Sequence, residues 1–415
     1  MNGMNDIIFT NARLLDGRTE EGRPDHHLRV SGGRIDEISD RPIRSGVVRT
    51  IDLKGRTLMP GLIDCHVHVC AAMANLVKNG QMPDALVALH AAKIMEGMLH
   101  RGFTTVRDAG GASYAMVESQ QTGLVAGPRL VIAGKALSQT GGHADFRGRY
   151  DTTPAEIQID RLGAIGRLCD GVAECRHAAR DEIRKGADYI KIMGNGGVSS
   201  PTDRIEYLGF AEDEIAAIVE EAGKAHTYVA AHLYTDESIE RAVRLGVRSI
   251  EHANLIEPET AQLMKAKGAY ACPTMAIFWA NKTEGTAVGI PDHAIAKIDS
   301  VLAKGKEALD ILASAGVPMA FGTDLVGAMH RHQSHEFLLR AEVLPAIDVI
   351  RSATVVAAEL LCMEGEIGVL ETGARADLIM IDGDPVRDLS LLTEQGRHMP
   401  IIMQEGRLVK NAQTI

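Results

Sequence analysis

The sequence predicts an α/β protein, a (β/α)8 TIM barrel with a small β-sandwich domain built from both chain ends. Short apolar runs alternate with helical segments through the middle of the chain, which is typical of parallel strands joined by helices. Both ends carry β-prone runs broken by glycine turns. The length of 415 residues suits a barrel with one small appended domain.

The two chain ends share one pattern of short, β-prone runs. In the first 57 residues these runs lie at 7–10, 27–30 and 47–53, and in the last 40 at 376–385 and 401–410. Chain termini often lie close together, so we expect the two ends to form one β-domain. The predicted boundaries are 1–59 and 366–415 for this domain and 60–365 for the barrel.

The middle of the chain supplies eight strands separated by helices. Helical segments include 85–100, 175–185 and 212–226. Eight strands over about 250 residues match a (β/α)8 barrel, whose catalytic groups lie at the C-terminal ends of the strands. The expected strands are 62–69, 104–107, 129–133, 189–193, 228–233, 249–252, 270–273 and 319–323.

Composition excludes several classes of partner. The net charge is −11 and no basic block occurs, which argues against a nucleic-acid surface. The first ten residues lack a cationic region followed by an apolar run, and no segment approaches membrane-spanning length. Six cysteines without a dense framework favour free thiols in the cytoplasm. We expect a cytoplasmic homo-oligomer with a small-molecule or dipeptide substrate.

Metal-ligating residue types end several of the expected strands. His66 and His68 are two residues apart, so both imidazoles project from one face of the first strand. Each candidate alone has an ordinary structural explanation, such as a core histidine, a buried ion-pair partner or a helix N-cap. Those explanations lose weight when all the residues meet at one end of a barrel. The other strand ends carry Lys191, His232, His252 and Asp324.

This set of ligand types predicts two divalent metal ions. His66, His68 and Asp324 can hold one ion, and His232 and His252 the other, with open positions left for catalysis. An anion must bridge the ions. Burial and two nearby cations would lower the pKa of the lysine on the fourth strand and favour its neutral amine. Reaction of that amine with carbon dioxide would give a carbamate that can bridge two metals.

The chain resembles the amidohydrolase superfamily over essentially its whole length. The resemblance rests on Pro60-Gly-Leu-Ile-Asp-Cys-His-Val-His, on the four other ligand positions and on Gly373-Ala-Arg-Ala-Asp-Leu-Ile. It implies binuclear zinc, N-carboxylated Lys191 as the bridging ligand, and a hydroxide between the metals. It also implies that Asp324 acts as general base and then general acid.

Within the superfamily, the chain most resembles the binuclear Xaa-Pro dipeptidases, the prolidases. Deaminases and imidazolonepropionases of the superfamily have a mononuclear pattern, with a Glu three residues after the histidine of the fifth strand. This chain has Thr235 at that position, which argues for the binuclear hydrolases. The expected activity is cleavage of the amide bond of dipeptides or N-acyl amino acids, with Xaa-Pro dipeptides as substrates. Alternatives are an Xaa-Arg/Lys dipeptidase or carboxypeptidase, a hydrolase of a cyclic amide or lactone, and a non-catalytic barrel scaffold.

Further residues are expected near the substrate. Tyr234 shares the face of His232 if the strand continues, and His143 lies on a glycine-rich loop that can reach the barrel mouth. In the resembled dipeptidases, the matching Tyr and His contact the substrate near its carbonyl and carboxylate. Arg331 could bind a terminal carboxylate in a bidentate fork, although a solvated helix face explains it equally well.

Other features of the sequence receive weaker assignments. The loop 194–201 lacks the Walker pattern of a phosphate loop and suits a mobile, substrate-covering loop instead. Cys70 lies two residues after His68, so its side chain would project from the same face and a thiolate there could be a further metal ligand. An inert residue just beyond the strand is the simpler interpretation. A specificity pocket for Arg or Lys would need a carboxylate, and three glutamates lie on loops that could face it: Glu206, Glu284 and Glu336.

Overall fold

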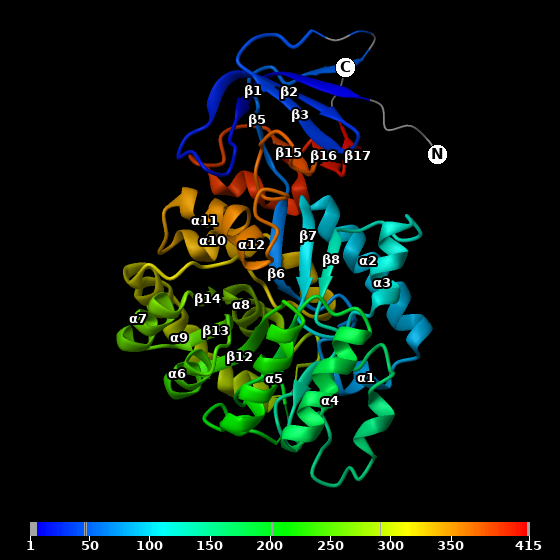
Figure 1. Ribbon diagram of the computed structural model, residues 1–415, viewed down its shortest axis with the longest axis vertical. Coiled ribbons are helices and arrows are strands. Elements are labelled where there is room, and N and C mark those ends of the chain that lie inside the picture. Colours follow the sequence, from blue (N-terminus) through cyan, green and yellow to red (C-terminus); the bar gives the residue numbers. More distant parts are fainter. Residues whose placement is uncertain (1–5, 45, 47, 201, 291, 413–415) are drawn as a thin grey trace.

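The computed structural model describes residues 6–44, 46, 48–200, 202–290 and 292–412. A β-sheet occupies one end of the molecule, and the remainder is an α/β body in which helices surround central strands (Figure 1). Both chain ends enter the sheet. Parts of some sequence predictions lie outside the described residues: residues 1–5 and 413–415, Val47 of an expected strand and Pro201 of the expected covering loop.

Strands from both chain ends form one sheet, as the sequence predicts. Its order is β17-β16-β15-β5-β1-β2-β3, with β4 paired to β1. The two ends of the chain join where β15 runs antiparallel to β5, with Ile379 opposite Met59. The two-layer sandwich and the domain boundaries stay predictions. The strands are β1 (Ile7–Leu14), β2 (Arg23–Ser31), β3 (Arg34–Ser39), β4 (Arg49–Asp52), β5 (Thr57–Pro60), β15 (Leu378–Ile381), β16 (Ile401–Gln404) and β17 (Arg407–Asn411).

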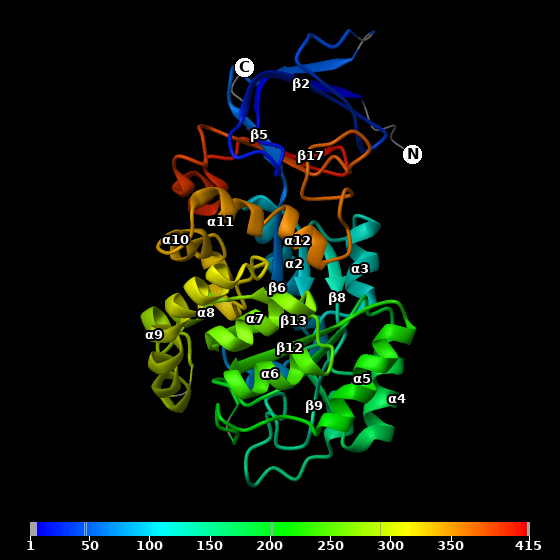
Figure 2. The same ribbon diagram turned by 60° about the vertical axis from the view of Figure 1, so that its left-hand side comes forward.

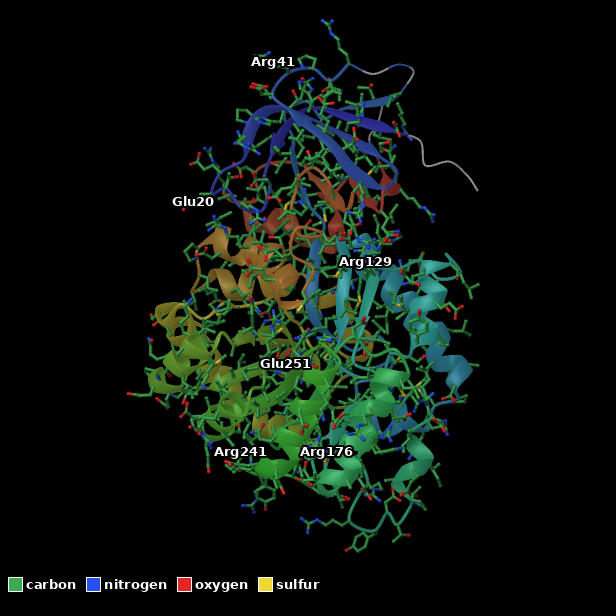
Figure 3. The ribbon with its side chains drawn as sticks, viewed as in Figure 1. Glu20, Arg41, Arg129, Arg176, Arg241 and Glu251 are labelled. Carbon is green, nitrogen blue, oxygen red and sulfur yellow. The ribbon has the colours of Figure 1, made fainter. Side chains whose placement is uncertain are left out.

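Polar contacts join this sheet to the α/β body. Arg129, labelled at the junction in Figure 3, lies 2.6 Å from Asp377 and 2.7 Å from Glu405. Gln404 donates a hydrogen bond of 2.8 Å to the carbonyl of Thr104. The sheet is therefore bonded directly to the first strands of the body.

The body contains two parallel sheets. A three-stranded sheet has the order β6-β7-β8, and a six-stranded sheet has the order β10-β9-β11-β12-β13-β14. Purely parallel sheets need helices on their faces, and the alternation of strands and helices supplies them. The strands are β6 (Leu62–Val67), β7 (Phe103–Asp108), β8 (Arg129–Ile132), β9 (Ala136–Ser138), β10 (Gly166–Leu168), β11 (Ile190–Met193), β12 (Val229–Thr235), β13 (Ser249–Leu255) and β14 (Tyr270–Cys272).

The third expected strand, 129–133, is present as β8 and ends one residue earlier than predicted. β8 ends at Ile132, and Gly134 follows with a φ of +68°, a left-handed conformation that glycine adopts without strain. The chain then forms β9, in which Leu137 pairs with Ile192 of β11. The sequence prediction contained neither β9 nor its partner β10.

The eighth expected strand, 319–323, forms only an isolated bridge between Met319 and Ala271. Its backbone changes partner within a few residues: the Ala320 amide donates to Ala271 of β14, and the Phe321 carbonyl accepts from Cys65 of β6. Too few consecutive pairs form with either neighbour for a strand. The segment touches both sheets, and closure into an eight-stranded barrel stays a prediction.

Helices cover the outside of the body, and Figure 2 shows α5, α6 and α7 beside β12 and β13. The three helical segments expected from the sequence are present as α2, α4 and α5. Within the described residues, no helix has the length and apolar character needed to cross a membrane. The helices are α1 (Leu76–Gln81), α2 (Asp84–His100), α3 (Tyr114–Gln121), α4 (Gly171–Arg184), α5 (Glu212–Lys224), α6 (Asp236–Arg244), α7 (Pro258–Lys267), α8 (Met275–Glu284), α9 (Asp292–Ala315), α10 (His335–Ala341), α11 (Ala346–Ser352) and α12 (Val355–Leu360), with 3-10 turns η1 (Ala155–Gln158), η2 (Gly327–His332), η3 (Leu389–Leu392) and η4 (Glu394–Gly396).

Candidate metal centre and active site

One cavity collects the strand-end residues. The cavity lies where β6, β11, β12 and β13 end, because the C-terminal ends of parallel strands meet at the same edge of a sheet. The predicted ligands from different strands therefore face one another, as the sequence analysis expects. The residues of the predicted metal set that line the cavity are His66, His68, Lys191, His232, His252 and Asp324.

His66 and His68 both point at Asp324. The Nε2 atoms of the two imidazoles lie 3.4 Å and 3.2 Å from Oδ1 of that carboxylate. Each Nδ1 atom is engaged elsewhere: that of His66 lies 2.7 Å from Glu251, and that of His68 lies 2.8 Å from the carbonyl of Gly110. A carbonyl or carboxylate oxygen only accepts, so each Nδ1 carries the proton and donates.

This arrangement fits a metal ion. Burial lowers the pKa of His68, but the hydrogen bond and charge of Asp324 outweigh it and raise that pKa, so without a metal this ring is biased towards the imidazolium that donates from Nε2. A neutral imidazole with its proton on Nδ1 instead directs a lone pair from Nε2 at an oxygen of Asp324, which offers only lone pairs itself. A cation between the atoms removes that conflict. Ligand atoms about 2.0–2.1 Å from a tetrahedral zinc ion lie about 3.3–3.4 Å apart, close to the two observed spacings. Among the described residues, the predicted ligands whose atoms all lie within 4.8 Å of one another are His66, His252 and Asp324, rather than His66, His68 and Asp324.

His232 and His252 form the second half of the set. Their ring centroids are 4.5 Å apart. The Nε2 atom of His232 is buried and has no hydrogen-bond partner among the described residues, whereas Nδ1 of His252 is 2.7 Å from the hydroxyl of Thr274. Burial lowers the pKa of both imidazoles well below the usual value. Both rings are therefore neutral and able to ligate a metal.

Lys191 is buried in β11 and faces these rings. Burial lowers the pKa of its amine, against the raising effect of Glu251 and Asp324. For Asp324, burial raises the pKa, but His66 and His68 outweigh it and hold the pKa well below the usual value. The centre thus combines an amine biased towards its neutral form with an ionised carboxylate.

Two of the candidate ligands have strained backbones. His252 has a φ of +74° and Asp324 a φ of +57°, in the left-handed region that side chains other than glycine rarely adopt. Such strain costs on the order of 1–3 kcal/mol per residue and persists where the surrounding structure holds it in place. Ten other described non-glycine residues also have a positive φ, so this conformation does not by itself mark the site.

A buried ion pair supports His66 from behind. Arg107 of β7 and Glu251 of β13 are fully buried, and their side chains meet at 2.7 Å. Figure 3 labels Glu251 near the centre of the body. Burial raises the pKa of Glu251, but Arg107 outweighs it and holds the pKa well below the usual value. The carboxylate therefore stays ionised and fixes the tautomer of His66.

Cys272 lies close to the same pair, because it forms a possible ligand triad with His66 and Glu251. Burial raises the pKa of its thiol well above the usual value, so the sulfur is not the thiolate that metals bind. Glu251 is already paired with Arg107. This triad is therefore a packing contact beside the metal centre.

The predicted substrate residues His143 and Tyr234 lie beside this centre. His143 lines the cavity and stacks on His232 with ring centroids 4.2 Å apart. Tyr234 is buried, and its ring lies 4.7 Å from that of His232 and 5.1 Å from that of His252. The structure thus brings both residues against the second pair of histidines.

Arg331 is placed elsewhere. It is exposed, forms an ion pair with Glu284 and does not line the cavity. The role of Arg331 as a carboxylate ligand stays a prediction without a supporting contact. The other weak candidates also lie apart from the cavity lining: Cys70 is buried, Glu206 is exposed, and Glu336 is buried against Arg340.

Sequence reasoning missed two polar residues near the cavity. Asn281 of α8 lines it and is 94% buried, with an Oδ1 atom that has no hydrogen-bond partner among the described residues. Asp203 lies behind His143, at 3.4 Å from Nδ1. Neither residue ends a strand, so the rule that located the metal ligands cannot find them.

Comparison with known proteins decides the family. A sequence model described as the Amidohydrolase family matches residues 57–409. The chain belongs to the amidohydrolase family. The resemblance read from the strand-end motifs is confirmed, and family membership makes this amidohydrolase a hydrolase.

Three individual relatives are similar to this chain over most of its length. The crystal structure of an amidohydrolase shares 49% identity and superposes with a TM-score of 0.96, covering 98% of this chain and 99% of that one. A prolidase complexed with N-methylphosphonate-L-proline shares 48% identity with a TM-score of 0.96, over 98% and 100% of the two chains. Ochratoxinase of Aspergillus niger is 30% identical over 373 residues, 85% of this amidohydrolase and 75% of the relative.

Proposed function

We propose that this amidohydrolase is a metal-dependent dipeptidase that cleaves Xaa-Pro dipeptides. The observation that carries the proposal is the 48% identity, over 98% of the chain, to a prolidase crystallised with a proline derivative. A centre built from four histidines, a lysine and an aspartate is consistent with this activity.

The proposed cofactors are two divalent ions, with zinc as the expected metal, on a closed (β/α)8 scaffold. His66, His68 and Asp324 would hold one ion, and His232 and His252 the other. When bound, the ions supply a nucleophilic hydroxide at neutral pH and polarise the scissile carbonyl. N-carboxylated Lys191 would bridge them: its neutral amine adds to carbon dioxide, forms an N–C bond and releases one proton.

Asp324 is the proposed general base and acid. Its ionised carboxylate lies beside His66 and His68. General acid–base catalysis contributes about 10²–10⁴-fold to such reactions. His143 and Tyr234, whose rings lie next to His232, are the proposed hydrogen-bonding partners of a substrate carbonyl or carboxylate. Of the two, His143 lines the cavity.

The lining of the cavity favours proline over arginine or lysine at the C-terminal position. A basic side chain needs a carboxylate at its far end, but Asp324, a proposed metal ligand, is the sole acidic residue among the described lining residues. A proline ring needs apolar contacts instead. The apolar side chains of the lining are Leu76, Phe146, Ile165, Met193, Ile277, Ile290 and Val326.

A panel of dipeptides tests the proposal. Zinc-loaded protein is expected to cleave Ala-Pro and Met-Pro with a higher kcat/KM than Ala-Arg or Ala-Lys. Ochratoxin serves as a further substrate, because the 30% identical relative is an ochratoxinase. Cleavage of ochratoxin or of basic dipeptides without cleavage of Xaa-Pro would contradict the proposal.

Asn281 is expected to contact the substrate through the free acceptor atom in its side chain. An α-ammonium group is a suitable donor, and a hydrogen bond to a charged group contributes about 1.5–3 kcal/mol. The variant Asn281→Leu should therefore lose about 10–100-fold in kcat/KM for Ala-Pro, since about 1.4 kcal/mol is a factor of ten.

A substrate without the amino group provides the control for Asn281. N-propionylproline has the shape of Ala-Pro but lacks the ammonium, so Asn281→Leu should change its kcat/KM little. Equal losses on both substrates would show that Asn281 does not recognise the amino group.

A further inference from the structure

We propose that Asp203 is a positioning residue that holds His143 in the candidate active site. The inference deepens the proposed function, because it rests on His143 contacting the substrate. It comes from four contacts around one imidazole ring, made by Gly197, Ser200 and Asp203 of the loop that follows β11 and by His232 of β12.

The His143 ring is held on several sides. Its Nδ1 atom lies 2.8 Å from the hydroxyl of Ser200 and 3.4 Å from Oδ2 of Asp203. Its face stacks on His232 at an interplanar angle of 23°. Gly197 also lies against the ring, because a Cβ atom added there would collide with the imidazole. The ring therefore has little freedom to rotate.

Asp203 is itself fixed within the loop. It is 96% buried, accepts a hydrogen bond of 2.9 Å from the amide of Gly197, and also accepts one from the hydroxyl of Ser200. One carboxylate thus organises the glycine, the serine and the histidine. The loop, which the sequence suggested as a mobile cover, is held by these hydrogen bonds at Gly197, Ser200 and Asp203.

The same loop is bonded to the strand that carries a metal ligand. Asn195 donates through Nδ2 to the carbonyl of Ile205 and accepts through Oδ1 from the amide of Tyr234, at 2.8 Å and 3.1 Å. Tyr234 follows His232 on β12. The position of Asp203, and through it that of His143, is therefore set by the strand that builds the metal centre.

The chemical consequence concerns the orientation of His143. The Ser200 hydroxyl donates its own proton to Asp203, so it accepts the N–H of Nδ1, and Nε2 is the ring nitrogen left for the substrate. Such partners behind a functional imidazole typically change affinity or activity by about 10–100-fold when removed. Without Asp203, the imidazole can turn and present either nitrogen.

A double-mutant cycle tests whether Asp203 acts through His143. Asp203→Ala should lower kcat/KM for Ala-Pro by about 10–100-fold in the wild-type background and by less than about twofold when His143→Ala is already present. Asp203→Asn keeps an acceptor at the same place and should recover part of the loss. The control Asp377→Asn, a buried carboxylate at the sheet junction, should have the same effect in both backgrounds.

A crystal structure of Asp203→Ala gives a second readout that needs no substrate. The expected result is a His143 ring rotated away from its stack on His232. Equal losses of activity in both backgrounds, or an unmoved ring, would overturn the inference. A wild-type enzyme that cleaves no Xaa-Pro dipeptide overturns the proposed function instead, and the position of the ring still decides the role of Asp203.

Discussion

Lys191→Ala is expected to lose both bound metal and activity. Without the amine no carbamate can form, so the two positive ions lack the anion that would bridge them and metal binding weakens. Metal stabilisation of transition-state charge is worth several kcal/mol, so the fall in kcat should be about 10³-fold or more. Metal content per chain and kcat on Ala-Pro are measured on the same samples.

Two comparisons make this prediction specific to the bridge. Acetate or propionate should restore part of the activity of Lys191→Ala, since a short carboxylate can occupy the bridging position. Lys135→Met removes a partly buried lysine, whose amine donates to the carbonyl of Arg161 outside the centre, and should keep its metal. A Lys191→Ala enzyme that is active and metal-replete would refute the carbamate.

Arg107→Met is expected to cause the largest loss of stability. It leaves Glu251 buried and ionised without its partner, and removal of one member of a buried ion pair costs about 3–5 kcal/mol. His66 also loses its fixed acceptor if Glu251 takes up a proton. Urea unfolding, followed by the fluorescence of the single tryptophan, Trp279, measures the change.

The matched control for this prediction is Arg387→Ala. Arg387 is 85% exposed and its ion pair with Asp384 spans 3.7 Å, so its loss should change stability by less than about 1 kcal/mol. The double variant Arg107→Met with Glu251→Leu should recover part of the stability, because no buried charge remains unpaired. Equal effects of Arg107→Met and Arg387→Ala would contradict the account.

The strand alternation was enough to predict the α/β class and the pairing of both chain ends. Periodicity could not show that the chain would form β9 after Gly134, since a strand of three residues is too short to carry an alternating pattern. It also could not show that 319–323 would bond briefly to two different neighbours. Both differences arise from hydrogen bonds between segments distant in sequence.

The same limit applies to the site. Residues at strand ends were predictable, because parallel topology alone brings them together; His66 and Asp324 meet for this reason. Asp203 and Asn281 act from a loop and a helix, whose positions depend on tertiary packing. Arg331 has the positive charge that a carboxylate ligand needs, but its ion pair with Glu284 depends on the tertiary structure and could not be predicted from the sequence.

The most direct test is a metal titration of the metal-free protein, with kcat/KM for Ala-Pro measured at each ratio of bound zinc to chain. The account predicts negligible turnover without metal and a plateau when two ions are bound per chain. Full activity of the metal-free protein, or a plateau at one ion, would contradict a binuclear centre built on His66, His68, Lys191, His232, His252 and Asp324.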